Sequence, residues 1–270
     1  MENSIAKLAN KYGIIPLKKY GQNFIYDQTL CDKIVKVSGL NNHDLVLEIG
    51  SGPAGLTRAI LKKRPKKLTV IETDVRCIKL LQELSQNNDN LNIIHADALQ
   101  VKLAEILKPN ESVHIIANLP YNIGTKLLIN WLYELKQITS MTIMLQKEVI
   151  DRITAKIDSK TYGRLSVICQ LMCNVKKQFD VSPKAFYPEP KIWSSIITLT
   201  PKSDPPSLVL LKKIAEITNL AFSGRRKMIK SSLKNLTPNI ESHLQEIGLT
   251  GTLRAENLSP ENYLTLAKKL

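Results

Sequence analysis

Cysteine is scarce in this chain, and the spacing of its cysteines matches no common metal site. The four cysteines (Cys31, Cys77, Cys169 and Cys173) are scattered, no two are spaced as Cys-x-x-Cys, and no histidine lies near enough in sequence to complete a zinc site. We therefore expect buried thiols and no bound metal.

Long apolar runs are also missing. The N-terminal region contains Glu2, has no arginine before Arg58, and has no apolar stretch of the length of a signal peptide or a membrane span. We therefore expect a cytoplasmic protein that does not enter a membrane. Internal repeats and low-complexity segments are not evident either.

Acidic residues are fewer than basic ones. The 38 Lys and Arg residues against 24 Asp and Glu residues give a formal net charge of +14. The resulting field favours polyanions, so nucleic acid is the leading partner class. Lysine outnumbers arginine, however, and a lineage-wide lysine bias is an alternative explanation. Charge alone does not decide between them.

The chain is long enough for one α/β domain and a smaller second domain, with 270 residues and 43% hydrophobic content. Residues 1–40 have the composition of a polar N-terminal arm that includes a short helix over residues 28–37. Apolar segments of strand type then alternate with helix-compatible sequence. This alternation predicts a doubly wound parallel sheet of α/β class. The expected strands are residues 45–49, 68–72, 92–95, 113–117 and 141–145.

The pattern changes after the fifth expected strand. Residues 167–181 and 194–200 are apolar, β-branched runs joined by a proline-containing loop, which predicts an antiparallel pair closing the sheet. Residues 201–207 hold three prolines, and we place the domain boundary there, giving domains of residues 1–204 and 205–270. The second domain has helical patterns only, over residues 208–222, 225–235, 240–247 and 260–269.

A glycine-rich turn, Gly50-Ser51-Gly52-Pro53-Ala54-Gly55, joins the first expected strand to a helix. Glycines in such a turn let the backbone approach a ligand closely, and purely structural turn glycines are the alternative. The spacing fits a dinucleotide-binding loop as well as a methyltransferase loop. Glu72 ends the second strand, where a carboxylate can accept hydrogen bonds from both ribose hydroxyls of an adenosine-containing cofactor.

Asp97 follows the third expected strand, where it would lie beside an adenine amino group. The alternative role is a helix N-cap. Together, Gly50, Glu72 and Asp97 favour S-adenosylmethionine over a dinucleotide without deciding between them.

The tetrapeptide Asn118-Leu119-Pro120-Tyr121 comes directly after the fourth strand, at the edge where such sheets bind ligands. An amino group on an aromatic ring is a weak nucleophile, because its lone pair is delocalised. If the Asn118 side-chain oxygen and the Leu119 carbonyl each accept one N–H, the lone pair can point at a sulfonium methyl group. Pro120 would orient that carbonyl, and the Tyr121 ring would stack on the base. The alternative is an ordinary turn.

With these motifs in hand, the chain resembles the ribosomal RNA adenine dimethyltransferase family, in particular its bacterial small-subunit branch. The resemblance extends over most of the chain and is carried by seven segments. They are Gly21-Gln22-Asn23-Phe24-Ile25, Leu47-Glu48-Ile49-Gly50-Ser51-Gly52, Ile71-Glu72, Ala96-Asp97-Ala98, Asn118-Leu119-Pro120-Tyr121-Asn122-Ile123, Val181-Ser182-Pro183-Lys184-Ala185-Phe186 and Ala221-Phe222-Ser223-Gly224-Arg225-Arg226-Lys227.

The resemblance implies a class I methyltransferase of Rossmann-like fold that uses S-adenosylmethionine and no metal. It implies dimethylation of the N6 amino groups of two adjacent adenosines in the 3′-terminal hairpin of small-subunit ribosomal RNA, coupled to small-subunit assembly. The partners would be that RNA and the immature subunit, and we expect a monomer. The implied cofactor residues are Gln22, Asn23, Ile25, Gly50, Gly52, Glu72, Asp97 and Asn118.

For catalysis the resemblance implies Asn118, Leu119 and Tyr121, with Phe186 as a second aromatic residue on the opposite face of a flipped adenine. A core phenylalanine is the alternative for Phe186. The chain departs from the family pattern at Ile25, Gly124 and Trp193, where the family usually has Leu, Ser and Asp.

The segment between Ile217 and Ile240 contains five cations and no acidic residue. Ile229, Leu233 and Leu236 would face the core of a helix and the cations would lie on another face, where they could follow an RNA backbone. A solvated helix face is the alternative. The expected RNA-binding residues are Arg225, Arg226, Lys227, Lys230 and Lys234.

Three other functions remain open at this point. A large-subunit adenine methyltransferase that confers macrolide resistance shares the core motifs. A non-catalytic assembly or transcription factor would need the fold and the basic segment but not Asn118. A nicotinamide dehydrogenase would share the glycine-rich turn and give the tetrapeptide no role.

Overall fold

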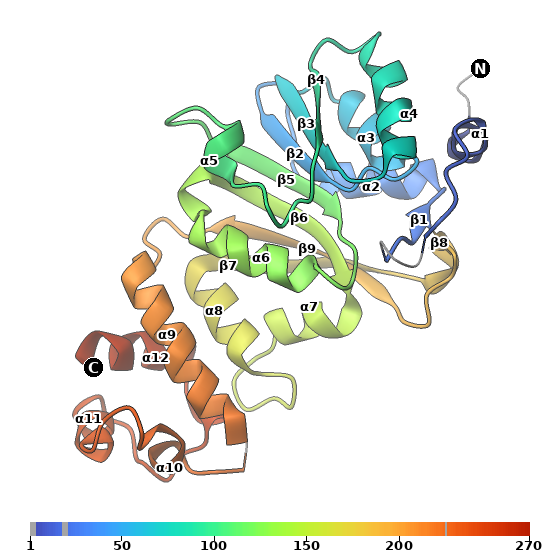
Figure 1. Ribbon diagram of the computed structural model, residues 1–270. Helices are drawn as coiled ribbons and strands as arrows, with labels where there is room; N and C mark the ends of the chain where they lie inside the picture. Colours follow the sequence, from blue (N-terminus) through green and yellow to red (C-terminus); the bar gives the residue numbers. More distant parts are fainter. Residues whose placement is uncertain (1–3, 18–20, 225) are drawn as a thin grey trace. The chain divides into compact units, whose positions relative to one another are not determined.

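The computed structural model describes residues 4–17, 21–224 and 226–270 (Figure 1). The chain divides into two compact units, each built from two segments. The first unit comprises Met1–Lys147 and Lys176–Thr200, and the second comprises Glu148–Val175 and Pro201–Leu270. The second segment of the second unit begins at Pro201, close to the boundary expected at residue 204. The same unit also contains Glu148–Val175, which falls within the first domain expected from the sequence.

The first unit is organised around a seven-stranded sheet whose order in the described chain is β4-β3-β2-β5-β6-β9-β7. The pairs β2–β3, β2–β5, β3–β4 and β5–β6 are parallel, whereas β9 runs antiparallel to β6. The expected doubly wound α/β sheet is therefore confirmed. The strands are β2 (Leu45–Ile49), β3 (Lys67–Glu72), β4 (Leu91–His95), β5 (Val113–Asn118), β6 (Ile138–Gln146), β7 (Cys173–Val181) and β9 (Ser194–Pro201).

Both faces of the parallel part of the sheet are buried. Because alternate residues of a strand point to opposite faces, Val46 and Leu47 lie on different sides of β2, yet each is 1% exposed. Val46 belongs to a cluster that includes Ile34 of α2 (Gln28–Val37), Ile60 of α3 (Gly55–Leu61) and Leu81 of α4 (Val75–Ser85). Burial of each such side chain contributes roughly 1.5–3 kcal/mol, which explains the nearly continuous apolar strands.

The N-terminal arm differs from the expectation. It begins with helix α1 (Ile5–Lys11), in which Ile5, Leu8 and Ala9 are buried at helical spacing and Ser4 caps the first turn. Further along, β1 (Phe24–Ile25) pairs antiparallel with β8 (Phe186–Tyr187), and helix α2 follows as predicted, capped by Asp27. The arm is thus attached to the sheet unit by apolar contacts and by a short strand pair.

The expected strand over residues 167–181 is wrong in its first part. Residues Arg164–Met172 form helix α8, and β7 begins only at Cys173. The N–H of Gly163 donates to the Ser166 hydroxyl at the start of the helix, and most residues of the helix are buried. A short, apolar, β-branched run fits a buried helix as well as a buried strand, and tertiary burial decided between them.

The second unit is mainly helical. Two buried tyrosines bond to its irregular segments, with Tyr162 Oη donating to the Leu258 carbonyl at 2.9 Å and Tyr263 Oη to the Ala255 carbonyl at 2.8 Å. Its helices are α8, most of α7 (Lys147–Ile153), α9 (Leu208–Ala221), α10 (Ile229–Leu233), α11 (Ile240–Glu246) and α12 (Pro260–Lys269). None of the helices in the described residues has the length and apolarity needed to cross a membrane.

Candidate active site at the carboxyl edge of the sheet

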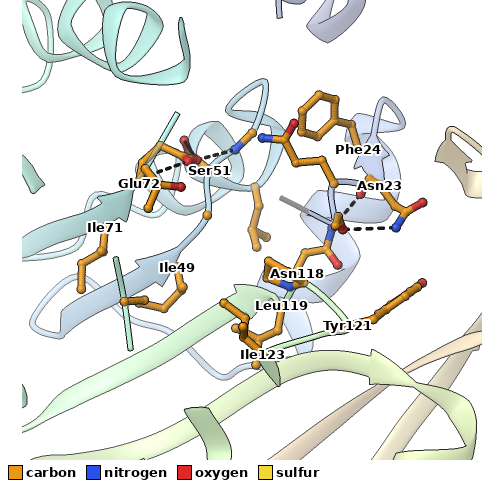
Figure 2. A pocket seen from close by; sticks show the side chains of 18 of the residues that line it. Asn23, Phe24, Ile49, Ser51, Ile71, Glu72, Asn118, Leu119, Tyr121 and Ile123 are labelled. Atoms are coloured by element: carbon orange, nitrogen blue, oxygen red, sulfur yellow. Dashed lines mark hydrogen bonds between the residues drawn. The ribbon is translucent and has the colours of Figure 1, made fainter. Parts of the chain in front are cut away.

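A cavity of about 290 Å³ lies within the first unit, where β2, β3 and β5 end. The N-terminal arm contributes residues 21–25 to its wall (Figure 2), and residues 96–99 after β4 contribute another side. The cavity wall brings together all but one of the cofactor and catalytic residues expected from the sequence. These are Gln22, Asn23, Ile25, Gly50, Gly52, Glu72, Asp97, Asn118, Leu119 and Tyr121.

The glycine-rich turn has the backbone that its sequence predicts. Gly50 and Gly52 have φ values of +71° and +51°, which residues with a Cβ rarely adopt. A Cβ on Gly52 would lie 2.9 Å from Cδ1 of Phe24, so the N-terminal arm can close over the turn only because this residue is glycine. The Gly50 N–H donates to the Ile71 carbonyl at 2.9 Å, which fixes the turn against β3.

Glu72 ends β3 with its side chain 5% exposed and its carboxylate held by several donors. Oε2 accepts from the Ser51 hydroxyl and the Gly52 N–H, each at 3.2 Å, and Oε1 accepts from the N–H groups of Thr73 and Asp74 at 2.8 and 2.9 Å (Figure 2). This network holds the carboxylate at the cavity wall, next to the glycine-rich turn.

Asp97 lies on the cavity wall after β4. Its Oδ1 accepts from the Leu99 N–H at 2.9 Å, and its carbonyl accepts from the Gln100 N–H at 2.9 Å. The side chain therefore caps a turn, whereas helix α5 (Leu103–Ile106) starts several residues later. The helix N-cap alternative for Asp97 does not hold.

Asn118 is the last residue of β5. Its Nδ2 donates to the Asn23 carbonyl at 3.3 Å, so the amide is tied to the N-terminal arm (Figure 2). In this orientation Oδ1 is left as an acceptor. Leu119 is 1% exposed, and its N–H donates to the Met144 carbonyl at 3.3 Å, which attaches the tetrapeptide to β6.

The rest of the tetrapeptide leads into helix α6 (Gly124–Tyr133). The Pro120 carbonyl accepts from the N–H groups of Ile123 and Gly124 at 3.2 and 2.9 Å. The Tyr121 hydroxyl bonds to the Ser194 hydroxyl at 2.6 Å, and burial raises the pKa of this phenol. Tyr121 lies at the end of the cavity opposite Glu72, with its ring extending away from Asn118 (Figure 2).

Phe186 is the catalytic candidate that the structure does not bring to the cavity. Its side chain is 5% exposed and belongs to the main apolar cluster, and its backbone pairs with Ile25 between β8 and β1. The geometry favours the core alternative for Phe186.

Sequence reasoning missed two hydroxyl residues that support the site. Ser51 bonds to Glu72, and Ser194 bonds to Tyr121. Ser51 could have been found, since it lies inside the glycine-rich turn. Ser194 follows Tyr121 by 73 residues, and no local pattern signals that contact.

The basic segment of the second unit is not the single helix expected over residues 225–235. Arg225 lies outside the described residues, and α10 spans only Ile229–Leu233. Met228 instead forms a β-bridge with Arg254, and the Ile229 N–H donates to the Leu253 carbonyl, which keeps the preceding backbone extended.

The cations of this segment therefore do not form one helical stripe. Arg226 and Lys227 are exposed ahead of α10, and exposed Lys234 follows it. Lys230 pairs with Glu241 at 3.0 Å. Ile229 and Leu233 are buried, as expected.

Comparison with known proteins gives concordant results. A family model described as ribosomal RNA adenine dimethylase matches residues 17–270. A relative from Wolbachia sp. subsp. Drosophila simulans, named ribosomal RNA small subunit methyltransferase A, is 44% identical over 96% of this chain and 95% of its own length. A relative of the same name from Zymomonas mobilis is 43% identical over 96% of this chain and 92% of its own length.

Solved structures share the fold. The 23S rRNA methyltransferase ErmE superposes with a TM-score of 0.71 at 26% identity, covering 92% of this chain and 99% of that one. A dimethyladenosine transferase from Plasmodium falciparum superposes with a TM-score of 0.76 at 24% identity, covering 90% and 95%.

Proposed function

Because this chain belongs to the ribosomal RNA adenine dimethylase family, we propose that it methylates the N6 amino groups of two adjacent adenosines in the 3′-terminal hairpin of small-subunit ribosomal RNA. The observation that carries this proposal is the position of the tetrapeptide Asn118-Leu119-Pro120-Tyr121 on the same cavity as the glycine-rich turn and Glu72. The naming of the 40–44% identical relatives supports the small subunit as the source of the RNA.

The residues of the cavity fit S-adenosylmethionine. A Cβ on Gly52 would collide with Phe24, so glycine lets the N-terminal arm lie against the turn at the cavity wall, and Glu72 presents a carboxylate at the end of β3. We assign the ribose hydroxyls to Glu72 and the adenine amino group to Asp97. Gln22, Asn23, Ile25, Gly50, Gly52 and Asn118 complete the proposed cofactor site. When bound, this cofactor supplies an electrophilic methyl group on a sulfonium sulfur.

The chain's own contribution to methyl transfer is orientation. In the first transfer, Asn118 Oδ1 and the Leu119 carbonyl would each accept one N–H of the adenine amino group, which turns the nitrogen lone pair toward the methyl group. Transfer of the methyl group would form a carbon–nitrogen bond as the carbon–sulfur bond of the cofactor broke. The nitrogen then carries a positive charge and releases its proton to solvent, so no strong base is needed. Tyr121, fixed through Ser194, offers a ring on which the adenine stacks.

Recognition of the RNA would use the basic surface of the second unit. Arg226, Lys227 and Lys234 are exposed, and the whole chain carries a net charge of +14. We assign phosphate contacts to these residues, to Arg225 and to Lys230, and we keep residues 205–270 as the RNA-contacting domain. We further propose that the substrate is an immature small subunit in the cytoplasm. One copy of the chain is expected to suffice, since every proposed cofactor residue comes from one unit.

A methyl-transfer assay tests the proposal. The purified chain is incubated with S-adenosylmethionine labelled in its methyl group and with undermethylated small-subunit particles, and the modified nucleotides are mapped by mass spectrometry. Dimethylated adenosines at two adjacent positions are expected, and Asn118→Ala serves as the inactive control. A parallel incubation supplies undermethylated large-subunit particles, and label found only in an adenosine of that RNA would instead assign the activity named for ErmE. Binding of a dinucleotide without binding of S-adenosylmethionine would refute both.

A further inference from the structure

Two aromatic side chains at the ends of the loop between β8 and β9 are exposed to solvent. Tyr187 is 60% exposed and Trp193 is 51% exposed, whereas Trp131, the other tryptophan of the chain, is 4% exposed. Burying a large aromatic side chain contributes much favourable free energy, so an exposed pair on one short loop indicates a binding surface.

Both ends of this loop are attached to residues that line the cavity. Tyr187 is opposite Phe24 in the β1–β8 pair, and its ring lies 6.2 Å from the ring of Tyr26. At the other end, the residue after Trp193 is Ser194, whose hydroxyl holds Tyr121. The strand pair of β1 and β8 is visible beside the loop in Figure 1. Tyr187 and Trp193 therefore lie on a loop whose two ends are tied to residues of the cavity wall, Phe24 and Tyr121.

The backbone of the loop is restrained. The Trp193 carbonyl accepts from the Lys147 N–H at 2.9 Å, directly after β6. Pro188 and Pro190 fix two of the φ angles between the aromatic residues. A restrained loop loses little conformational entropy when a ligand covers its rings, so it is suited to binding flat groups.

The charge near these rings fits a polyanion. Lys184 and Lys191 are exposed on either side of Tyr187, and the loop contains one acidic residue, Glu189. Unpaired bases stack on aromatic rings while lysines contact the phosphates, and this combination is typical of single-stranded nucleic-acid sites.

We propose that Tyr187 and Trp193 form a stacking platform for the unpaired bases that flank the target adenine. The proposal rests on the function proposed above, in that RNA is the substrate. The platform positions the RNA strand outside the cavity, while Asn118, Leu119 and Tyr121 act on the adenine inside it. Its ligand is single-stranded RNA, and its contribution is to RNA affinity.

The test uses an RNA hairpin whose loop contains two adjacent adenosines. Trp193 fluorescence is expected to be quenched when this RNA is titrated into the full chain, since a stacked base quenches an exposed indole, and the quenching is expected to disappear in Trp193→Phe. Trp193→Ala is expected to weaken binding roughly 5- to 10-fold, the lower part of the range for base stacking of about 1–3 kcal/mol. Trp193→Phe should retain most of the affinity. Ile192→Ala, an aliphatic change on the same loop, should bind like the wild type.

Several results would overturn the platform. RNA binding without quenching, or wild-type affinity in Trp193→Ala, would remove the stacking role. Unchanged affinity for the hairpin together with a raised KM for intact particles would show that the loop contacts a protein. Calorimetric binding of S-adenosylmethionine by each variant shows that the fold is intact. Because the titration requires no methyl transfer, it reports on the platform even if the methylation assay fails.

Discussion

Gly124, the first residue of α6, packs directly behind the tetrapeptide, and an added methyl group there would disturb it. A Cβ at this position would lie 2.6 Å from Cδ2 of Leu145 and 3.2 Å from Cβ of Leu119. Carbon atoms in contact are normally about 3.5–4.0 Å apart, so the Leu145 contact must open by roughly 1 Å. Leu145 is 2% exposed and Leu119 is 1% exposed, so neither side chain can relieve the contact by turning out into solvent.

We therefore expect Gly124→Ala to cost about 1–3 kcal/mol of stability, as overpacked core substitutions do. The effect on catalysis should be larger than the effect on cofactor binding, since Leu119 carries the carbonyl proposed to orient the amino group. A misplacement of about 1 Å can cost roughly a hundredfold in rate. The assay measures kcat for methyl transfer, the Kd for S-adenosylmethionine by calorimetry, and the melting temperature.

Two further variants make this prediction specific. Leu145→Ala removes the crowded methyl groups, so the double variant should recover kcat relative to Gly124→Ala, with a coupling energy of about 0.5–3 kcal/mol. Gly163→Ala is the matched control, because a Cβ there meets no atom within 4 Å. A Gly124→Ala enzyme with wild-type kcat and melting temperature would refute the reasoning, as would independent effects of the two substitutions.

The other predictions concern catalysis, RNA binding, stability and thiol reactivity. Asn118→Ala should lower kcat by about 10²- to 10³-fold, as loss of one oriented transition-state contact does, and an unchanged kcat would exclude it from catalysis. Arg226→Ala should weaken RNA binding and reduce the slope of log affinity against log salt by about 1, measured by filter binding. Glu48 is fully buried, and burial raises its pKa to about 8. Neutral Glu48 therefore contributes to stability at acidic pH, and this contribution is lost as the pH rises toward 8. In urea unfolding, Glu48→Gln should be more stable than the wild type near about pH 9 and not near about pH 5. Burial raises the pKa of the Cys31 and Cys173 thiols to about 12, so the native chain should resist alkylation at about pH 8, and rapid labelling counted by mass spectrometry would contradict that burial.

The sequence by itself determined the parallel sheet and most of the cavity. The strands are apolar because both faces of the sheet are buried, and this gives a pattern that is readable locally. Gly50, Glu72 and Asn118 lie at the ends of β2, β3 and β5, which are neighbours in the sheet, and parallel strands place their carboxyl ends along one edge. These residues proposed for the cofactor therefore meet at one edge of the sheet, and their positions in the sequence are enough to predict this.

The tertiary structure alone decided the features that depend on distant contacts. Phe186 is buried because β8 pairs with β1, more than 160 positions earlier in the chain. Helix α10 does not extend back to Arg226, because Met228 pairs with Arg254. The apolar pattern of residues 167–172 suits a buried helix as well as a buried strand, and tertiary burial selected the helix. Tyr121 is held by Ser194, and Gly124 is crowded by Leu145. Such contacts carry no local signal, because the free energy that selects them is gained only when the chain has folded.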